Sequence, residues 1–481
     1  ESSPTMNTFK HKSLYAAVAG LGALSAAGVA QAVSVNHDGL GQALIYPYYT
    51  VRVAPTGLVG SDAAYNSLLS VVNSTTSAKA VKVRFLEGKN SREVLDFNLY
   101  LSAKDVWTAA IIPTTDGAGI FTADKSCTTP VVSSSSASPT AFVNYAYSGS
   151  NDDKAGTSLD RTREGYVEII EMGDLIGVTA AAVTHVSGVP ACSPLGGASA
   201  DTVPGKGGLF GSITLVNVLK GEDFGLDPTA LDGFSSTALW FAPGDIKPNL
   251  ANVNPKTSVV VAGSNVFITD WSLSTNAVDP VSAVLMHNNV YNEFVLDAST
   301  KSGTDWVVTF PTKNYYYTGT TVTKLFQSNF SATGACDDVV VTQYDREERT
   351  IVSQTSFSPP PPTQTDSLCW EANVISFNGT NVLGSKNVSN IPTTFVNGWA
   401  SLNFLGSTVP AGRHQLIGGG STVFNTKTGT TFTLAATTFN GLPVIGFAAI
   451  VFENGTLTSG GINLQSNYGG NFNHKLTSDV K

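Results

Sequence analysis

Charged residues are scarce in this chain of 481 residues, since Asp, Glu, Lys and Arg make up only 13% of it. That is about half of the usual share in a globular protein. Ser, Thr, Asn and Gly fill the polar positions instead, a composition common in extracellular β-proteins. The formal net charge is −9 and no basic cluster is present. The sequence therefore argues against nucleic acid or an anionic membrane surface as a partner.

Cysteine is also scarce, with four residues in the whole chain. They are too few for a disulfide scaffold, but their number is even. An exported chain meets an oxidising compartment, so we expect two disulfides. Of the three pairings that four cysteines allow, we predict Cys127–Cys192 and Cys336–Cys369, because sequential pairing keeps each bridge within one section of the chain.

Long apolar runs are absent except near the beginning, at residues 14–29. Lys10 and Lys12 precede this run, and Ala-Gln-Ala follows it at residues 30–32. This is the order of a secretory signal peptide: a charged region, an apolar region and a cleavage site of small residues. A membrane-spanning helix needs about 20 apolar residues. We therefore expect translation to start at Met6, cleavage before Val33, and no transmembrane span in the mature chain.

Motifs of enzymes and metal sites are absent too. His37, His185, His287, His414 and His474 are widely scattered, and none forms a pair at metal-ligand spacing. The segment at residues 197–201, Gly-Ala-Ser-Ala-Asp, lacks the last glycine of a nucleophile elbow. We therefore predict no catalytic, cofactor-binding or metal-binding residues, and no cofactor.

Two groups of carboxylates remain as candidates for glycosidase chemistry, which needs two carboxyl groups roughly 5–9 Å apart. Glu168 and Glu171 lie near one expected strand. Asp345, Glu347 and Glu348 alternate with arginines. The alternation favours a solvated strand end with internal ion pairs over an active site.

The clearest pattern in the chain lies at residues 79–112. Val81, Val83 and Phe85 alternate with Lys82 and Arg84, which indicates a strand with one buried face and one face in water. Two further strand-like runs follow, so we expect a three-stranded antiparallel meander whose buried face needs a partner sheet. The predicted fold is mainly β: an antiparallel β-sandwich of the Ig-like or jelly-roll type, with long loops and one or two short helices.

The rest of the chain supports this fold class. Asp227-Pro228 and Asp279-Pro280 each have the pattern of a helix start. Asn378-Gly379 and Asn454-Gly455 predict type I′ turns between strands. Further strands are expected at residues 41–49, 68–72, 165–170, 212–219, 258–262, 266–271, 305–310, 339–341, 432–434 and 444–452.

We expect three sections. Residues 1–32 form the signal-peptide region. Residues 33–225 form an N-terminal β-sandwich domain with a long surface loop at 113–160. Residues 226–481 form a C-terminal β-rich domain with a proline-rich loop at 358–363.

Aromatic clusters are the best candidates for contact with a partner. If exposed, they could stack on sugar rings or anchor a protein, although strand tyrosines more often flank the core. The two clusters are Tyr46, Tyr48 and Tyr49, and Tyr315, Tyr316 and Tyr317.

Three segments resemble large secreted proteins of Gram-negative bacteria that are described only as surface or hypothetical proteins. They are GQALIYPYY at residues 41–49, VRFLEG at 83–88 and TDWVVTFP at 304–311. The resemblance implies an exported, bacterial, cell-surface setting. It implies no activity and no site residues.

Together these features predict a secreted or cell-surface protein, with the periplasm as the alternative location. It would be structural or adhesive and act by binding or self-assembly without catalysis. Its partner would be a second copy, a surface glycan or a surface protein. The alternative is a carbohydrate-active enzyme or a lectin-like module on the same scaffold. Exposed edge strands would favour assembly, and an aromatic strip beside a cleft with two close carboxylates would favour the alternative.

Overall fold

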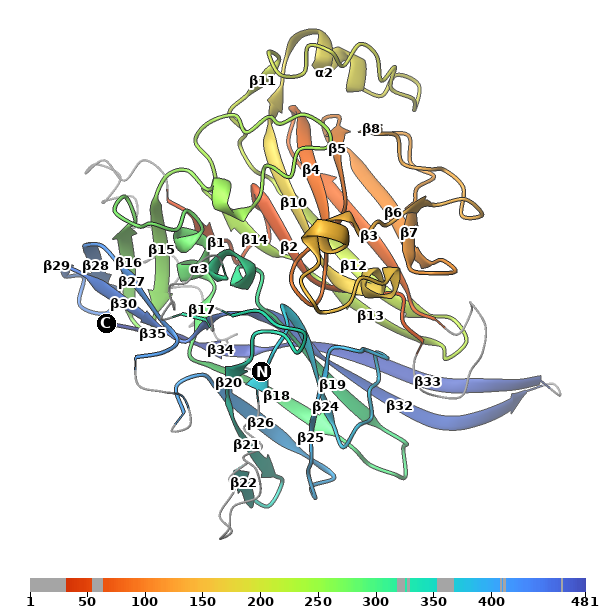
Figure 1. Cartoon of the computed structure of the whole chain (residues 1–481), viewed down its shortest axis with the longest axis vertical. Helices are drawn as coiled ribbons and strands as arrows, with labels where there is room; N and C mark the ends of the chain where they lie inside the picture. Colours follow the sequence, from red (N-terminus) through yellow and green to blue (C-terminus); the bar gives the residue numbers. More distant parts are fainter. Residues whose placement is uncertain are drawn as a thin grey trace, which may run out of the picture.

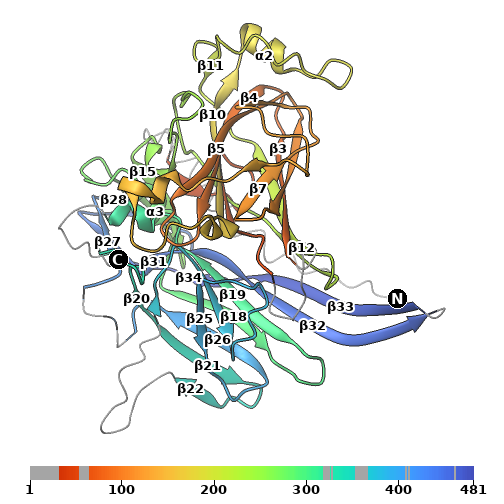
Figure 2. The ribbon, with the colours of Figure 1, turned by 45° about the vertical axis from the view of Figure 1, so that its right-hand side comes forward.

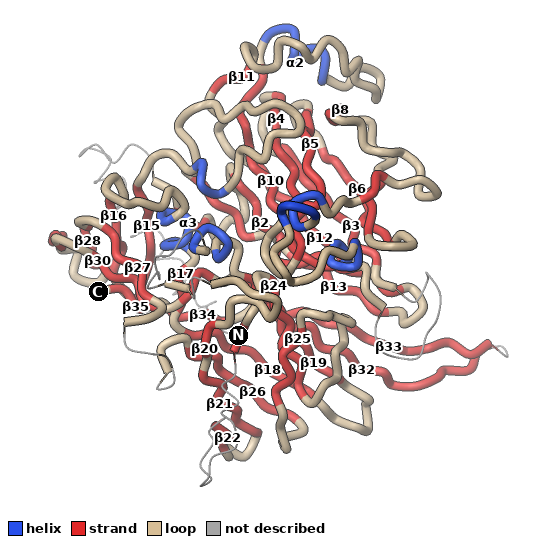
Figure 3. Tube along the Cα trace, viewed as in Figure 1, coloured by secondary structure: helices blue, strands red, loops and turns tan. Residues whose placement is uncertain are grey.

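The computed structural model describes residues 32–53, 64–317, 325–326, 329–352, 367–406, 409, 412–459 and 462–481. The chain is mainly β, with 48% in strands and 8% helical. The described residues include two α-helices, α2 (Gly177–Val183) and α3 (Asp279–Val284), and Figure 3 shows how little of the chain is helical. No helix among these residues is long and apolar enough to cross a membrane. The predicted signal peptide, except Ala32, and the proline-rich loop lie outside the described residues.

The N-terminal part is a sandwich of two antiparallel sheets, coloured orange and yellow in Figure 1. Their inner faces share a core that includes Tyr46, Val83 and Trp107. The first sheet has the order β1 (Ser34–Val35), β14 (Thr229–Asp232), β2 (Ala43–Thr50), β10 (Glu164–Leu175), β4 (Ala78–Glu87), β5 (Glu93–Leu101) and β8 (Cys127–Thr129), with β11 (Thr202–Val203) paired to β10. The second has the order β13 (Glu222–Leu226), β12 (Leu209–Asn217), β3 (Asn66–Asn73), β6 (Val106–Pro113), β7 (Ala118–Phe121) and β9 (Thr140–Ala141).

A middle sheet lies between this sandwich and a lower sheet. Alternate residues of its strands face opposite ways: Val307 and Phe447 belong to the core of the upper sandwich, whereas Trp306 and Ala448 belong to the core shared with the lower sheet. Burial on both faces explains the continuous apolar run at residues 445–452, in the strand next to the central one. The order is β25 (Val388–Ile391), β24 (Ala372–Phe377), β19 (Gly303–Thr309), β32 (Ile445–Ser459) and β33 (Ile462–Asn473).

The lower sheet and several small sheets complete the molecule. The lower sheet has the order β22 (Thr350–Val352), β21 (Val340–Asp345), β26 (Asn397–Asn403), β18 (Asn289–Val295) and β34 (Lys475–Thr477). The small sheets are β15 (Thr257–Ala262), β16 (Asn265–Asp270), β28 (Ser421–Asn425) and β29 (Thr431–Leu434); β27 (Gln415–Gly418), β30 (Thr437–Asn440) and β35 (Asp479–Val480); β17 (Met286–His287) with β31 (Leu442–Pro443); and β20 (Asp337–Asp338) with β23 (Ser367–Leu368). Short 3-10 helices are η3 (Tyr145–Tyr147), η4 (Gly149–Asn151), η5 (Leu159–Arg163), η6 (Leu250–Asn252) and η7 (Lys313–Tyr316).

The β32–β33 hairpin projects from the body of the molecule. Both ribbon views show the two blue strands running far beyond the other strands of the middle sheet (Figures 1 and 2). β32 pairs with β19 only over residues 445–451, although it continues to Ser459. The outer part of the hairpin is therefore a two-stranded ribbon.

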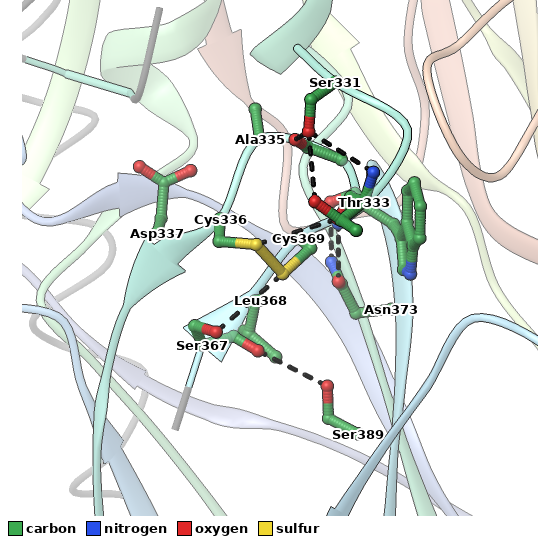
Figure 4. The surroundings of a disulfide bond; sticks show 12 residues. Ser331, Thr333, Ala335, Cys336, Asp337, Ser367, Leu368, Cys369, Asn373 and Ser389 are labelled. Carbon is green, nitrogen blue, oxygen red and sulfur yellow. Dashed lines mark hydrogen bonds between the residues drawn. A yellow bond between two sulfur atoms is a disulfide. The ribbon is translucent and has the colours of Figure 1, made fainter. Parts of the chain in front are cut away.

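Both disulfides join the cysteines that we paired from the sequence, Cys127 with Cys192 and Cys336 with Cys369. The second lies beside the β20–β23 pair (Figure 4). There the backbone amide of Ala335 donates to the carbonyl of Cys369 at 3.0 Å. Both bridges suit an oxidising compartment.

The structure corrects the expected meander in two ways. β6 does not pair with β5; it crosses to the facing sheet and pairs with β3. The polar face of β4 is not in water, because Lys82 and Arg84 are buried. Lys82 Nζ donates to Asp96 at 2.9 Å and to the carbonyl of Asp245 at 3.1 Å, in a loop that covers this face.

Three local predictions are also wrong. The expected loop at 113–160 contains the short strands β7, β8 and β9. Residues after Asp227-Pro228 form β14 and not a helix, whereas the helix at Asp279-Pro280 is confirmed as α3. β32 continues through Asn454-Gly455 with a register irregularity, so this dipeptide is not the hairpin turn. The predicted domain boundary at 225/226 stays a prediction; β14, just beyond it, belongs to the first sheet.

Candidate functional site

The first pair of candidate carboxylates is held in buried ion pairs. Glu171 lies 2.5 Å from Lys79 Nζ, which also bonds to Asp174 at 2.6 Å. Glu168 pairs with the guanidinium of Arg84. Burial raises the pKa of Glu171 to about 7, against the opposing effect of Lys79. Two surface hollows, of about 520 and 190 Å³, are lined by other residues, so neither offers these carboxylates to a substrate.

The second group forms a strand-end turn, as the alternation with arginines indicated. Arg349 Nε donates to the Asp345 carboxylate at 2.6 Å, and Arg349 Nη2 lies 3.6 Å from the Glu347 carboxylate. The Asp345 carboxylate also accepts from the backbone amide of Glu347 at 3.0 Å. The carboxylate is thus used to close the turn.

The tyrosine clusters do not form a contact surface. Tyr46, Tyr48 and Tyr49 are fully buried. The hydroxyl of Tyr48 donates to Glu164 at 2.8 Å, and that of Tyr46 to the carbonyl of Ser70 at 2.7 Å. The prediction that this cluster contacts a partner is therefore wrong, because β2 is a central strand with cores on both faces.

The second tyrosine cluster lies in the turn η7, against the core. Tyr316 is buried and its hydroxyl donates to Asp279 at 2.6 Å. Tyr315 and Tyr317 are partly buried. Tyr316 thus braces the start of α3, whereas the ring of Tyr317 packs against Phe330. In the part of the chain that the structure describes, no group of His, Cys, Asp and Glu is arranged to hold a metal ion.

Tyr145 and Phe210 are exposed singly in the N-terminal half, and two sets of aromatic side chains with exposed members lie on the C-terminal half. One set crosses the outer face of the lower sheet, where Trp399 on β26 stands between Tyr344 and Tyr291. The rings of Tyr344 and Trp399 stack with centroids 4.2 Å apart and an interplanar angle of 12°. Because the faces of these rings cover each other, they act first as a cross-strand pair that stabilises the sheet.

The other set lies on β33, the edge strand of the middle sheet. Tyr468 is 57% exposed and Phe472 is 49% exposed, and both project from the same face of the strand. Gly470 lies between them, with the Phe472 ring 3.4 Å from the position of a β-carbon there. Residues 467–473 of β33, which we call the hairpin edge, form the candidate site.

Alternate residues of the hairpin edge turn their backbone groups away from β32. The amide of Glu453 on β32 donates to Thr300, on the side away from β33. Because bonding direction alternates along an antiparallel ladder, its registered partner Asn467 also turns its backbone groups away from the hairpin. The same holds for Gly469, Asn471 and Asn473. β13 crosses above Gly469, where a β-carbon would lie 2.9 Å from the carbonyl of Asp223, but forms no ladder with β33.

Length and lack of charge set this edge apart. β33 has twelve residues, INLQSNYGGNFN, with no charged residue and no proline. The next longest edge strand in the described structure, β15, has six residues and is bonded by the backbone of Val33. β13 carries Glu222 and Asp223, and β34 carries Lys475. Charges, prolines and shortness are the usual protections of sheet edges, and β33 has none of them.

The high content of Asn and Gly makes this site hard to recognise in the sequence. The segment at 462–473 is rich in Asn and Gly, which are depleted in strands, so no strand was predicted there. The usable signal was the spacing of Tyr468, Gly470 and Phe472 at alternate positions within an uncharged stretch.

Comparison with known proteins adds no assignment: no family model, no curated protein and no solved structure matches the chain.

Proposed function

We propose that this protein is an exported structural or adhesive protein of the cell surface, and that it works by contact through the hairpin edge. A free strand edge binds by adding a strand from another chain, with backbone hydrogen bonds giving affinity and side chains giving specificity. The observation that carries the proposal is the uncharged sequence of the twelve-residue edge strand β33, whose ladder partner in the described part of the chain is β32.

The aromatic side chains of the hairpin edge support the same proposal. A strand added beside residues 467–473 would bring side chains next to the exposed rings of Tyr468 and Phe472. Full burial of one large apolar side chain stabilises by about 1.5–3 kcal/mol.

A strand-blocking variant tests the proposal. Asn471→Pro removes an amide that faces away from β32, so it leaves the ladder of the hairpin intact, whereas it takes a hydrogen bond from any added strand. Asn471→Thr is the matched control, because it keeps the amide. Light scattering coupled to size-exclusion chromatography should show association of the wild type and of Asn471→Thr, and at least a tenfold weaker association of Asn471→Pro.

A strict monomer at all concentrations that also binds no cell-surface material would contradict the proposal. So would equal association of all three proteins, since the contact would then lie elsewhere. The native disulfide pattern, checked by peptide mapping, confirms that each variant is folded.

One observation favours the alternative of a lectin-like module. Trp399 is 41% exposed, and the same face of the lower sheet carries the neutral polar residues Ser401, Asn403 and Thr342. Neutral hydroxyl and amide groups beside an aromatic ring suit a neutral sugar. Binding in a glycan screen that is lost in Trp399→Ala but kept in Asn471→Pro would support this function over assembly through the hairpin edge.

A further inference from the structure

We infer that Lys79 and Asp174 form an intramolecular amide bond, with Glu171 as the group that carries the protons. The bond joins two neighbouring strands of the first sheet, β4 and β10, whose register places Lys79 directly opposite Asp174. The two strands lie side by side below α2 and β11 (Figure 1). The ion pair described above is the state from which the bond forms.

The first support is that nucleophile, acceptor and proton carrier are in contact. Nζ of Lys79 lies 2.6 Å from Oδ1 of Asp174 and 2.5 Å from Oε1 of Glu171. All three side chains are buried, and Lys79 is fully so. Groups held in contact in this way react as if at very high concentration, with effective molarities of about 10⁵–10⁸ M in well-oriented cases.

The second support is that burial favours the product. The ion pair keeps one cation and two carboxylates away from water, and buried charges are costly even when they are paired. An amide is neutral, so the bond removes one cation and one anion from the interior. The side chain of Asp174 retains 5% exposure, so the water that is formed there has a short way out.

The third support is that Glu171 is held as a proton carrier and not as an acceptor. The backbone amide of Gly207 donates to its Oε2 at 2.9 Å. The backbone of Gly205 covers its carboxyl group, because a β-carbon at Gly205 would lie 2.3 Å from Cδ of Glu171. The carboxyl carbon is thus shielded, while Oε1 faces Lys79. Burial raises the pKa of Glu171 to about 7, so this group can take up and release a proton near neutral pH.

The reaction balances without any further reactant. Glu171 takes one proton from the ammonium of Lys79, which frees the lone pair of Nζ. Nζ then bonds to Cγ of Asp174, and one of the C–O bonds of Asp174 breaks. The departing oxygen leaves as water with two protons from the nitrogen, both relayed by Glu171. The amide nitrogen keeps one proton, and Glu171 returns to its initial state.

Lys82, on the same strand, gives an internal comparison. Its Nζ bonds to the carboxylate of Asp96 at 2.9 Å and to the carbonyls of Ala242 and Asp245 at 3.3 and 3.1 Å. A backbone carbonyl does not take a proton from an ammonium, so these contacts supply no second carboxyl group to carry protons. We therefore expect Lys82 to remain in an ion pair.

The mass of the purified wild type tests the bond. After reduction of both disulfides, the denatured protein should be lighter than its mature sequence by one water, about 18 Da. Tandem mass spectrometry of a digest should find the peptides of Lys79 and Asp174 joined. Lys79→Arg is the matched control, because it keeps the positive charge but its guanidinium stays protonated and is not a nucleophile; it should have its full mass. Asp174→Asn should reach the same linked product by losing ammonia, about 17 Da.

The role of Glu171 has its own variant. Glu171→Gln keeps the shape of the side chain but cannot relay protons, so its bond should form on the order of 100-fold more slowly, followed by intact mass at successive times. A wild type at its full sequence mass, with the native disulfides found by peptide mapping, would overturn the inference. A bond from Lys79 to Glu171 would overturn the choice of acceptor, and equal rates in Glu171→Gln would overturn the proton carrier. None of these outcomes affects the proposed contact function, since the hairpin edge lies in another sheet.

Discussion

Strands β10 and β33 both have twelve residues. A buried strand usually carries fewer charges than an exposed one, but these two strands show the reverse. β10 is buried along its whole length and carries Glu164, Glu168, Glu171 and Asp174. β33 is a sheet edge with exposed aromatic rings and carries no charge. The strand that never meets water is acidic, and the strand that does is neutral.

The difference follows from what each strand pairs with. The carboxylates of β10 meet cations from neighbouring strands, Lys79 and Arg84 on β4 and the residue Arg52 just after β2. Buried charges are tolerated when they are paired and hydrogen-bonded. In the described structure β33 has a ladder partner on one side, and on its other side a charge would oppose strand addition. The charges of β10 are therefore paired within the fold, whereas the lack of charge on β33 leaves its edge suited to a further strand.

The largest effect should come from breaking a buried pair of β10. Lys79→Met leaves Glu171 and Asp174 buried without their shared cation. Losing one partner of a buried ion pair costs about 3–5 kcal/mol of the free energy of unfolding. Urea denaturation followed by circular dichroism measures it, with exposed Lys427→Met as the control, for which we expect a change below about 0.5 kcal/mol. A loss as small as that of the control would show that the charges of β10 are not needed for the fold.

The sequence predicted local structure well and long-range surroundings poorly. Alternation of Val81, Val83 and Phe85 correctly predicted β4, because side-chain direction in a strand has period two. It wrongly placed Lys82 in water, because the cover comes from a loop about Asp245, far along the chain. No local pattern states which distant segment will cover a face.

The sequence does not predict the candidate site, for a related reason. Whether Tyr46 or Tyr468 meets solvent depends on how many neighbours its strand has: among the described residues, β2 pairs with β10 and β14, whereas β33 pairs with β32 alone. Strand order is set by pairings across hundreds of residues, so the sequence could name aromatic candidates but could not rank them. The disulfides were predictable because each closes within one section of the chain.

A smaller effect should appear on changing pH. Burial raises the pKa of Glu171 to about 7 from an ordinary value of about 4.5, so the folded state holds this proton more tightly than the unfolded state. Its stabilising contribution is complete below about pH 4.5 and is lost as pH rises through 7, on the order of 3 kcal/mol. Glu171→Gln should flatten the dependence of unfolding free energy on pH between 5 and 7.5. An unchanged slope in this variant would show that other groups set it.

The smallest effect should be the response of self-association to salt, and its sign is decisive. An interface built on ion pairs weakens as salt screens them, often steeply. The hairpin edge has no charge to screen, whereas the two copies as wholes each carry −9 and repel. Raising NaCl from 50 to 500 mM should therefore leave the dimer dissociation constant unchanged or lower it by less than about threefold. Sedimentation velocity at several concentrations measures the constant.

Exposed Lys427→Glu makes the net charge more negative at a position away from the edge, so it should make the strengthening of the dimer by salt slightly larger. A dimer that weakens tenfold with salt would place the contact on charged residues, and so outside β33.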